Sequence, residues 1–324
     1  MTNWAIMGPG GIANKFAQAL MQCKDARLIG CASKSIEKAQ EFKKAYDLKY
    51  AYGSYNELVA NNEIDAVYVS TTHNFHYECA KTALLAGKHT VVEKAFTVNA
   101  AQAQELVDIA TEKNVFLMEA MWTRFLPAFK WAKDMVLKGE IGDLQNVTAS
   151  LCVDFPYEPS SRIFNINLAG GGLLDVGIYN LSIACFFLGC DPAKIQSSGS
   201  IGKTGVDENV SVILSYEKGR TATLNHSIIY KTKNDVYIHG TKGYIHIPSF
   251  VDAQAAQLVY NDGKSAECNT PHDNGFIYEV EEINSLIKAG KKESHVITHD
   301  DTVKIIKICD KLRADWGLVF PGER

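Results

Sequence analysis

The chain has 324 residues, of which 46% are hydrophobic and 22% are charged, and its formal net charge is −4. This length and composition are typical of a globular protein with room for two hydrophobic cores. The small negative charge argues against nucleic acid or an anionic membrane surface as the main partner. No apolar run approaches the roughly 20 residues that span a bilayer, and a strand predicted within the first few residues leaves no room for a signal peptide.

The chain opens with an apolar run at residues 4–7, a glycine-rich turn and then a helical pattern. The turn follows the pattern G-x-G-x-x-A, with residues Gly8, Gly10, Gly11, Ile12 and Ala13. Gly8 permits a tight strand-to-helix turn, Gly10 leaves the backbone open to a pyrophosphate, and the small Ala13 lets the helix approach its strand. Free N–H groups at the start of a helix attract phosphate. We therefore predict a dinucleotide-binding site, although such glycines also occur in ordinary turns.

Strand and helix patterns alternate through the first part of the chain. Strands are predicted at residues 27–31, 65–71, 90–93 and 115–118, and helices at 35–46, 76–85 and 100–113. This succession predicts an α/β fold in which a doubly wound parallel sheet of the Rossmann type carries helices on both faces. Ligands of such sheets bind beyond the carboxyl ends of the strands, so the residues that follow each strand are the candidates for a site.

The pattern changes after Arg124. A helix at 127–138 precedes strands at 146–153, 210–216, 220–229, 236–239 and 244–247, with one helical insert at 172–188 and closing helices at 276–289 and 300–314. We predict an α+β domain with a large open, mostly antiparallel sheet. The expected division is an NAD(P)-binding domain at 1–120 and a substrate-binding and dimerisation domain at 121–324.

The second predicted strand is followed by a hydroxyl and two cations, Ser33, Lys34 and Lys38. Folds that prefer NAD usually place Asp or Glu there, where the acid binds the ribose 2′-hydroxyl. A 2′-phosphate would instead be attracted by the hydroxyl and the lysines, so NADP is favoured and NAD remains possible. The alternative is that Ser33 or Ser35 only caps a helix and the lysines are solvated.

Further polar residues are expected at the same edge of the sheet as the glycines. They are Thr71, Thr72, Asn74 and His76 near the end of the strand at 65–71, Glu93 and Lys94 after the strand at 90–93, and Trp122 and Arg124 after the strand at 115–118. All of them except Arg124 are predicted to contact the cofactor. The histidines do not predict a metal site, because His73 and His76 have no carboxylate companion and His295 and His299 lack the glutamate of a zinc helix.

The eight cysteines are scattered and form no C-x-x-C pair. Several lie in apolar runs, such as Cys31 and Cys185, as small core residues do. This usage is typical of a reducing compartment rather than of a disulfide framework, so we expect a cytoplasmic protein.

The chain resembles the glucose–fructose oxidoreductase and inositol dehydrogenase (Gfo/Idh/MocA) family over nearly its whole length. The resemblance is carried by the glycine turn and by the segments 73–76, 86–89, 93–94, 170–179 and 240–243. The segment 119–125 and the pair Asp175 and Tyr179 are most similar to the branch that holds dimeric dihydrodiol dehydrogenase and NADP-dependent D-xylose dehydrogenase.

The resemblance implies roles for three residues. It places Lys94 near the substrate hydroxyl and the nicotinamide, with Asp175 and Tyr179 completing the site. Apart from the resemblance, we predict Trp122 and Arg124, which follow the strand at 115–118, as further substrate residues. The resemblance also implies a homodimer formed through the open sheet. Relatives usually read Glu-Lys-Pro where this chain has Ala95, and we expect a trans Lys94–Ala95 bond, because a cis bond to a non-proline residue costs ~3–4 kcal/mol.

Asp175 and Tyr179 lie four residues apart and would share one face of a helix. Moving a hydride from a carbinol carbon to nicotinamide requires a base for the hydroxyl proton. Our hypothesis is that Tyr179 transfers this proton, Lys94 supplies charge and orientation, and Asp175 positions substrate or lysine. Lys94 as the direct acid–base group is the competing assignment. Tyr179 and Trp122 are alternatively packing residues, and Arg162 either orders its loop or contacts the substrate.

The sequence thus predicts an oxidoreductase that transfers a hydride between NADP(H) and a secondary alcohol or hemiacetal carbon of a sugar or cyclic diol. One alternative is redox-assisted glycoside elimination with a retained cofactor. The other is a non-catalytic NADP-binding sensor, against which the joint presence of Lys94, Asp175 and Tyr179 argues.

Overall fold

The computed structural model describes residues 1–323, and its contacts divide the chain into two compact units. The first unit contains Met1–Trp122 and Asn274–Val303, and the second contains Thr123–Asp273 and the chain from Lys304. Arg324, the last residue of the predicted second domain, lies outside the described residues.

The first unit is built on a six-stranded parallel sheet with the strand order β3-β2-β1-β4-β5-β6. The strands are β1 (Thr2–Met7), β2 (Ala26–Ala32), β3 (Tyr50–Tyr52), β4 (Ala66–Val69), β5 (His89–Glu93) and β6 (Leu117–Ala120). This is the Rossmann order, in which the chain reverses direction across the sheet between β1 and β4 and opens a crevice for a dinucleotide there. The predicted doubly wound fold is confirmed.

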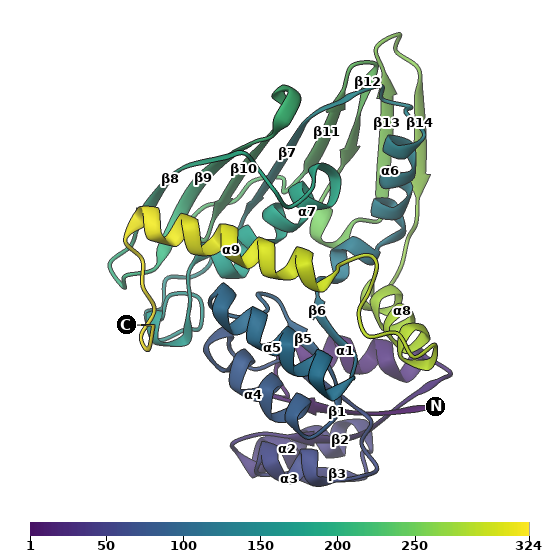
Figure 1. Cartoon of the computed structure of the whole chain (residues 1–324), viewed down its shortest axis with the longest axis vertical. Coiled ribbons are helices and arrows are strands. Elements are labelled where there is room, and N and C mark those ends of the chain that lie inside the picture. The colour runs from purple at the N-terminus through teal and green to yellow at the C-terminus, as the bar shows by residue number, and fades with distance from the viewer. Residues whose placement is uncertain (324) are drawn as a thin grey trace. The chain divides into compact units, whose positions relative to one another are not determined.

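Helices cover this sheet (Figure 1). They are α1 (Gly11–Gln22), α2 (Ile36–Tyr46), α3 (Tyr55–Ala60), α4 (His73–Leu85), α5 (Ala100–Lys113) and α8 (Phe276–Lys288). α4 and α5 pack against each other, and α1 packs against α8. The Asn99 side chain caps α5 by accepting from the Gln102 N–H, and left-handed Asn114 ends that helix. Apolar periodicity predicted the longer helices, but it missed the short α3 and β3.

The segment Asn274–Val303 returns to the first unit, although the predicted division at residue 120 assigned it to the second domain. The Trp4 indole donates to Asn284 Oδ1 at 3.0 Å, and the Asn274 amide donates to the Lys15 carbonyl at 2.8 Å. These contacts join residues far apart in sequence. Local patterning therefore gave no sign of them.

The second unit is built on an eight-stranded sheet with the order β14-β13-β12-β11-β7-β10-β9-β8. The strands are β7 (Leu144–Cys152), β8 (Lys194–Ile201), β9 (Asp207–Ser215), β10 (Thr221–Ser227), β11 (Val236–Gly240), β12 (Gly243–Ile247), β13 (Ala255–Tyr260) and β14 (Ser265–Asn269). All neighbours are antiparallel except β7 and β10. The prediction of a mostly antiparallel sheet is confirmed.

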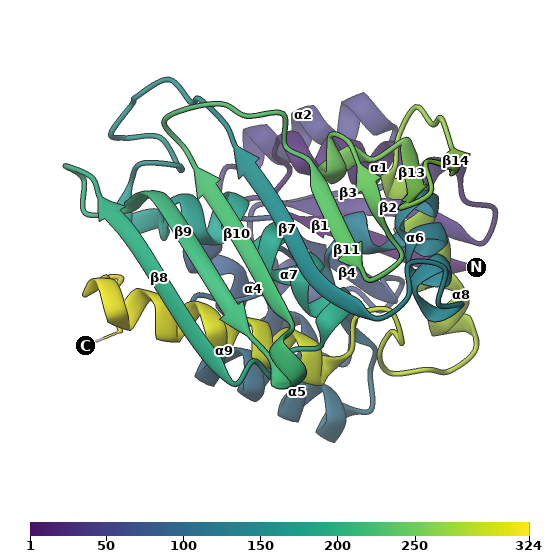
Figure 2. The same ribbon diagram turned by 90° about the horizontal axis from the view of Figure 1, so that it is seen from above.

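Helices pack on one face of this sheet. Helix α7 (Ile178–Leu188) lies against β7 and β10, and α6 (Pro127–Leu137) lies against β13 and β14. The part of α9 (His299–Trp316) from Lys304 onward also belongs to this unit, where the Trp316 indole donates to Ser197 Oγ at 3.0 Å. Figure 2 looks onto the opposite face, where no helix among the described residues covers the strands.

One segment, Ile166–Leu188, is long and apolar enough to cross a membrane by length and composition, with a mean hydropathy of 1.6. Buried residues make up 94% of its most apolar window. The segment is not an unbroken apolar run in the sequence, because Asn167 and the glycines Gly170–Gly172 interrupt it. The core helix of a water-exposed domain meets the same criteria, and α7 packs here against the sheet of its own unit.

Candidate active site

The glycine turn between β1 and α1 contains two kinds of glycine. Gly8 has a φ of +88°, and a Cβ there would lie 2.9 Å from Thr71 Cγ2 and 3.0 Å from the Ser70 carbonyl oxygen. Gly8 therefore lets β1 and β4 approach. A Cβ on Gly10 would come no closer than 3.9 Å to another residue, and one on Gly11 would meet nothing within 4 Å. Packing does not require these two glycines, and they leave the first N–H groups of α1 accessible to a ligand.

The residues after β2 form the N-terminus of α2. Ser35 is the N-cap, since its Oγ accepts from the Lys38 N–H at 3.4 Å, and Ser33 Oγ accepts from the Ser35 N–H at 3.2 Å. The Lys34 ammonium lies 3.6 Å from the centre of the Phe75 ring, an arrangement that favours the cation. The helix-capping alternative thus holds for Ser35, while Lys34 is more than a solvated side chain.

The residues after β4 begin α4. Thr71, Thr72 and Asn74 are half-buried, and the Thr72 hydroxyl donates to Asn74 Oδ1 at 2.7 Å. His76 is buried, with Nδ1 at 2.8 Å from the Ala95 carbonyl and Nε2 at 3.1 Å from the Thr71 carbonyl. Burial lowers the pKa of His76 to about 4, so the imidazole is neutral and donates through one nitrogen at a time.

The predicted cofactor contact of His76 stays a prediction, and the structure shows the contacts of the ring within the chain. Both ring nitrogens face carbonyl oxygens of the chain and the side chain is only 1% exposed. His76 ties the end of β4 to the segment that follows β5. The sequence correctly placed the imidazole near the carboxyl ends of the strands but gave no indication of its hydrogen-bond partners.

The Lys94–Ala95 peptide bond is cis, contrary to the predicted trans bond. Hydrogen bonds fix the backbone on its C-terminal side, where the Ala95 carbonyl faces His76 and the Phe96 N–H donates to Glu119 Oε1 at 3.1 Å. The Ala95 side chain is fully buried. The prediction weighed only the intrinsic preference of a non-prolyl bond, whereas these contacts come from α4 and β6.

Lys94 itself is half-buried at the carboxyl end of β5. Its backbone N–H donates to Glu93 Oε2 at 3.2 Å, and Glu93 Oε1 accepts from the Tyr68 hydroxyl. Glu93 was predicted to contact the cofactor, but both of its carboxylate oxygens are engaged within the sheet. Its observed role is to hold the backbone of Lys94.

Two further buried acids, Glu119 and Glu279, lie near Glu93, and neither is among the predicted site residues. Glu119 binds the Phe96 N–H, as described above. Neither carboxylate oxygen of Glu279, on α8, has a hydrogen-bond partner, and burial together with the charges of Glu93 and Glu119 raises its pKa well above the usual range. Glu119 could have been noticed in the sequence, because it is an acid within the otherwise apolar strand β6. The residues around Glu279 in the sequence give no such indication.

Trp122 is buried in the first unit, where its ring stacks on Phe276 with the centroids 4.6 Å apart. The structure thus shows the packing role that the sequence analysis gave as the alternative for this residue. Its predicted contacts with cofactor and substrate stay predictions.

Asp175 and Tyr179 lie in the second unit at the start of the predicted helical insert. Leu173–Gly177 forms a π-helical turn that contains Asp175, and Tyr179 is in the first turn of α7. Both side chains are buried, with 4% and 7% of their surfaces exposed. Single π turns within helices occur often at functional sites. The helix is therefore present over the expected residues, but its beginning is wider than an α-helix.

Arg162 is the partner that the sequence analysis left undecided. Its guanidinium donates to Asp175 Oδ1 at 2.6 Å, and Asp175 is the buried member of this ion pair. A charge-assisted bond of this length fixes the orientation of the carboxylate. Arg162 thus orders Asp175.

Arg124 was predicted to bind substrate, and the structure assigns it another role. The side chain is fully buried, its Nε donates to Ser182 Oγ at 2.8 Å, and Nη2 donates to the Ser182 carbonyl at 2.7 Å. The guanidinium therefore joins the segment after β6 to α7 within the second unit. These contacts account for the burial of Arg124, and its predicted contact with substrate stays a prediction.

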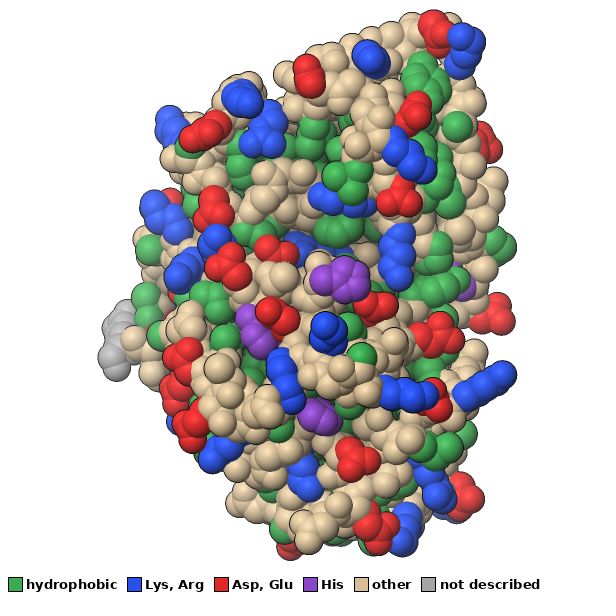
Figure 3. All heavy atoms as spheres, turned by 45° about the vertical axis from the view of Figure 1, so that its right-hand side comes forward, with side chains coloured by type: hydrophobic (Ala, Val, Ile, Leu, Met, Phe, Trp, Pro, Cys, Tyr) green, Lys and Arg blue, Asp and Glu red, His purple; other side chains and the backbone are tan. Residues whose placement is uncertain are grey.

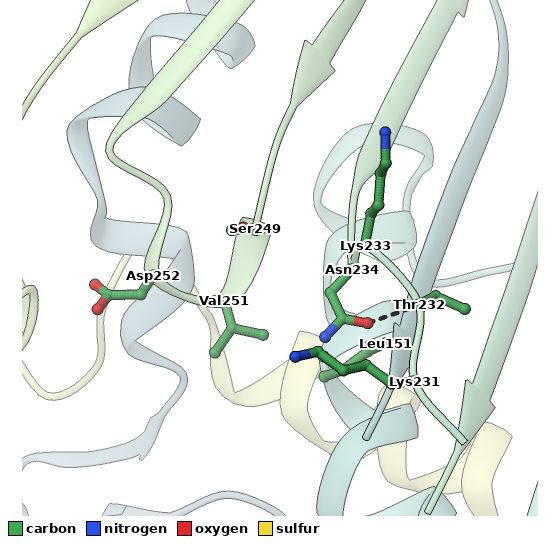
Figure 4. Close-up of a pocket in the computed structure, with 8 residues that line it drawn as sticks. All are labelled: Leu151, Lys231, Thr232, Lys233, Asn234, Ser249, Val251 and Asp252. Atoms are coloured by element: carbon green, nitrogen blue, oxygen red, sulfur yellow. Dashed lines mark hydrogen bonds between the residues drawn. The ribbon is translucent and has the colours of Figure 1, made fainter. Parts of the chain in front are cut away.

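The second unit also contains a pocket of about 550 Å³ (Figure 4). It is lined by Leu151, Lys231, Thr232, Lys233, Asn234, Ser249, Val251 and Asp252. Asn234 Oδ1 accepts from the Cys152 N–H and from the Thr232 hydroxyl, both at 2.9 Å. The lining offers hydroxyl, amide and ammonium groups to a polar ligand. The side chains of Lys231 and Lys233 extend in different directions (Figure 4), and none of the residues predicted for the site lines this pocket.

Figure 3 shows one face of the protein, on which acidic and basic side chains are interspersed rather than gathered by sign. Within residues 1–323 there is no group of three or more His, Cys, Asp or Glu side chains that could hold a metal ion.

Two family models match the chain. Residues 2–121 match an oxidoreductase family described by its NAD-binding Rossmann fold, and residues 129–246 match the GFO/IDH/MocA C-terminal domain. Trans-1,2-dihydrobenzene-1,2-diol dehydrogenase of Xenopus laevis is 33% identical over 332 residues, which cover 99% of both chains. The enzyme of that name from Mus musculus is 34% identical over 333 residues, covering 99% of this chain and 98% of the relative.

Solved structures share the fold. An aldose-aldose oxidoreductase from Caulobacter crescentus, complexed with glycerol, superimposes with a TM-score of 0.88 at 23% identity and covers 97% of this chain and 96% of its own. A 3-ketoreductase from Actinomadura kijaniata, in complex with NADP and TDP-benzene, gives a TM-score of 0.86 at 23% identity, with 97% of each chain covered.

Proposed function

The chain belongs to the GFO/IDH/MocA family of oxidoreductases, which act on CH–OH groups and carry an NAD-binding Rossmann domain. On this premise we propose that it transfers a hydride between NADP(H) and a secondary alcohol or hemiacetal carbon of a sugar or cyclic diol. One observation carries the proposal. Lys94 stands half-exposed at the carboxyl end of β5, with hydrogen bonds fixing the backbone around it, on the sheet edge where the N-terminus of α1 opens.

The cofactor residues of the proposal lie at that edge. The N–H groups at the start of α1 would bind the pyrophosphate, since Gly10 and Gly11 leave room that no side chain of this chain fills. Thr71, Thr72 and Asn74, beside the β1–β4 crossover, are the further cofactor residues. When bound, the nicotinamide accepts or returns the hydride.

We assign the preference for NADP to Ser33, Lys34 and Lys38, because no acid directly follows β2 to bind a ribose 2′-hydroxyl and Glu37 already lies in α2. The Actinomadura 3-ketoreductase is described with NADP, whereas a levoglucosan dehydrogenase of the same fold is described with NADH, so the fold accepts both. Changing Ser33→Asp together with Lys34→Ala should weaken NADPH binding more than NADH binding. Equal weakening of both would discard the assignment.

The substrate residues of the proposal are Lys94, Asp175 and Tyr179, with Trp122 as an apolar wall. Tyr179 takes the proton from the substrate hydroxyl during oxidation and returns it during reduction. The ammonium of Lys94 orients the hydroxyl and stabilises negative charge on oxygen, and Asp175, held by Arg162, positions the substrate or Lys94. Lys94 as the direct acid–base group is the competing assignment.

The direct test is a panel of aldoses, inositols and cyclic diols with NADP or NAD, followed by the absorbance of the reduced nicotinamide. The relatives named as dihydrobenzene-diol dehydrogenases make cyclic trans-diols the first compounds to try. We expect one mole of NADPH for each mole of substrate oxidised. Substrate consumed without net NADPH would indicate elimination with a retained cofactor, and cofactor binding without any turnover would indicate a sensor.

We also propose that the partner of this chain is a second copy, which covers the open face of the eight-stranded sheet. Four rings line up there on neighbouring strands, Tyr237 and His239 on β11 and Tyr244 and His246 on β12. Tyr237 and His246 stack with their centroids 4.4 Å apart. Ile213 on β9 is 45% exposed. Aromatic and aliphatic side chains on a flat sheet favour burial against a like surface.

A cytoplasmic location is part of the same proposal. Cys31 and Cys79 are buried thiols of the first unit, and burial raises the pKa of each to about 11, which makes them unreactive. Such use of cysteine suits a reducing compartment.

A further inference from the structure

The π-helical turn that carries Asp175 rests on two buried polar side chains from the sheet beneath it. Asp207, at the start of β9, accepts a hydrogen bond from the Leu173 N–H at 2.6 Å. His226, on β10, lies with Nε2 at 3.5 Å from Asp207 Oδ2. Both side chains are 1% exposed. The Asp207 carboxylate, on β9, therefore caps the first N–H of the π turn. An N-cap side chain does the same from within its own helix.

The glycines of this segment match these two side chains. A Cβ on Gly171 would lie 2.3 Å from Asp207 Oδ1, and one on Gly172 would lie 3.1 Å from Asp207 Oδ2 and 3.2 Å from the His226 ring. A Cβ on Gly177 would lie 2.7 Å from two atoms of the same ring. The imidazole therefore lies close to both ends of the turn: at Gly177 it leaves no space for a side chain, and at Gly172 a Cβ would make a tight contact with it.

The loop that carries Arg162 also contacts the segment that leads into the turn. A Cβ on Gly170 would lie 2.6 Å from the Ile163 carbonyl and 2.7 Å from the Arg162 carbonyl, and the Gly171 N–H donates to the Ile163 carbonyl at 2.8 Å. Arg162 then holds Asp175 by its guanidinium. The turn and the residues before it thus contact both this loop and the Asp207–His226 pair.

We propose that Asp207 and His226 are positioning residues for the acid–base site: they set the height and rotation of the π turn, and so the placement of Asp175 and Tyr179, without contacting substrate or cofactor. The inference rests on the proposed function of those two residues. Catalysis depends steeply on such placement, since a displacement of ~1 Å can lower turnover by ~100-fold. The glycines at 171, 172 and 177 then also help to place the turn, because the absence of their side chains lets Asp207 and His226 contact the backbone.

The first test is a double-mutant cycle at the contact between Gly177 and His226. In the wild-type background, Gly177→Ala drives a methyl group into the imidazole and should lower kcat by at least ~100-fold. In a His226→Ala background the ring is absent, and the same substitution should change kcat by less than ~3-fold. Equal losses in the two backgrounds would overturn the inference.

Two readouts separate positioning from general damage. The NADPH dissociation constant, measured by nicotinamide fluorescence, should stay within ~2-fold of wild type in all variants, because the glycine turn lies in the other unit. The thermal midpoint reports whether each variant folds. A loss of NADPH affinity in proportion to the loss of kcat would also contradict a positioning role.

A second pair of variants keeps the proposal testable if the alanine variants fold poorly. Asp207→Asn retains an oxygen that accepts from the Leu173 N–H, whereas Asp207→Leu removes it at similar volume. We expect kcat within ~5-fold of wild type for the first and a loss of at least ~50-fold for the second, at unchanged NADPH affinity. Equal kcat values would show that this hydrogen bond does not position the turn.

Failure of the inference is distinguishable from failure of the proposed function. Tyr179→Phe is measured in the same assay. If Tyr179→Phe keeps full turnover, the proposed role of Tyr179 fails whatever the cycle shows. If Tyr179→Phe loses turnover while the cycle shows no coupling, only the positioning role of Asp207 and His226 fails.

Discussion

At the scale of single residues, the site depends on groups whose local sequence says little about their partners. Lys94 was expected from its place after a strand, and it is there. Its backbone is set by Glu93, His76 and Glu119, which come from β5, α4 and β6. Asp175 is fixed by Arg162. The sequence pointed to most of these residues, but it did not show the contacts between them.

Tyr179 is the residue whose replacement tests the acid–base assignment. Tyr179→Phe removes only the hydroxyl, so turnover should fall by at least ~100-fold while NADPH affinity stays within a few-fold. Steady-state kinetics and fluorescence titration measure the two quantities. Tyr216→Phe is the matched control, since Tyr216 is a buried tyrosine of the same unit whose hydroxyl has no hydrogen-bond partner. Full activity in Tyr179→Phe would transfer the role to Lys94.

Glu279 gives a pH-dependent prediction for stability. Its pKa in the folded protein is raised well above the ordinary value of 4.5. Below about pH 4.5 both the folded and the unfolded chain hold the proton, and above it the unfolded chain loses the proton first, so the group destabilises the fold increasingly as pH rises. Glu279→Gln cannot ionise in either state. It should therefore gain stability relative to wild type as pH increases from 4.5 to 8.

Urea denaturation at several pH values measures this difference. Glu281→Gln, at an exposed position on the same helix, is the control and should show no such trend. A stability difference between Glu279→Gln and wild type that is the same at every pH would contradict a protonated Glu279.

At the scale of elements, the turn between β1 and α1 contains one glycine that the backbone requires, Gly8, and one that we assign to cofactor binding, Gly10. Gly8→Ala should lower the thermal midpoint, because Gly8 has a positive φ and Thr71 lies close to it. Gly10→Val should leave the midpoint nearly unchanged, since a Cβ there meets no atom closer than 3.9 Å, but it should weaken NADPH binding by at least ~10-fold. Differential scanning fluorimetry and NADPH titration test the pair. Unaltered NADPH affinity in Gly10→Val would remove the pyrophosphate from this turn.

Most elements could be predicted because their apolar periodicity is strong, as in α5 and in the alternating strand β7. The missed elements have physical reasons. Strand β8 is mostly exposed at the edge of its sheet and has a polar sequence, and β14 is an exposed edge strand as well. The π turn, the cis bond and the buried Asp207 and Glu279 depend on contacts between distant segments, which a pattern along the chain does not contain.

At the scale of the whole molecule, the open sheet face predicts self-association. Ile213→Lys together with Tyr237→Lys places two charges on this face and should convert a dimer to a monomer in sedimentation velocity experiments. Leu137→Lys is the control, because Leu137 is exposed on α6 rather than on the sheet. Wild-type protein that is monomeric at micromolar concentration would contradict the proposed second copy.

The central claim is that a pyridine dinucleotide binds at the N-terminus of α1, with Lys94 and Tyr179 serving the carbon that exchanges hydride with it. Titration of the purified protein with NADPH and with NADH, followed by nicotinamide fluorescence, tests this most directly. The account predicts saturable binding of one nucleotide per chain, tighter for NADPH than for NADH. Absence of binding of either nucleotide would contradict it.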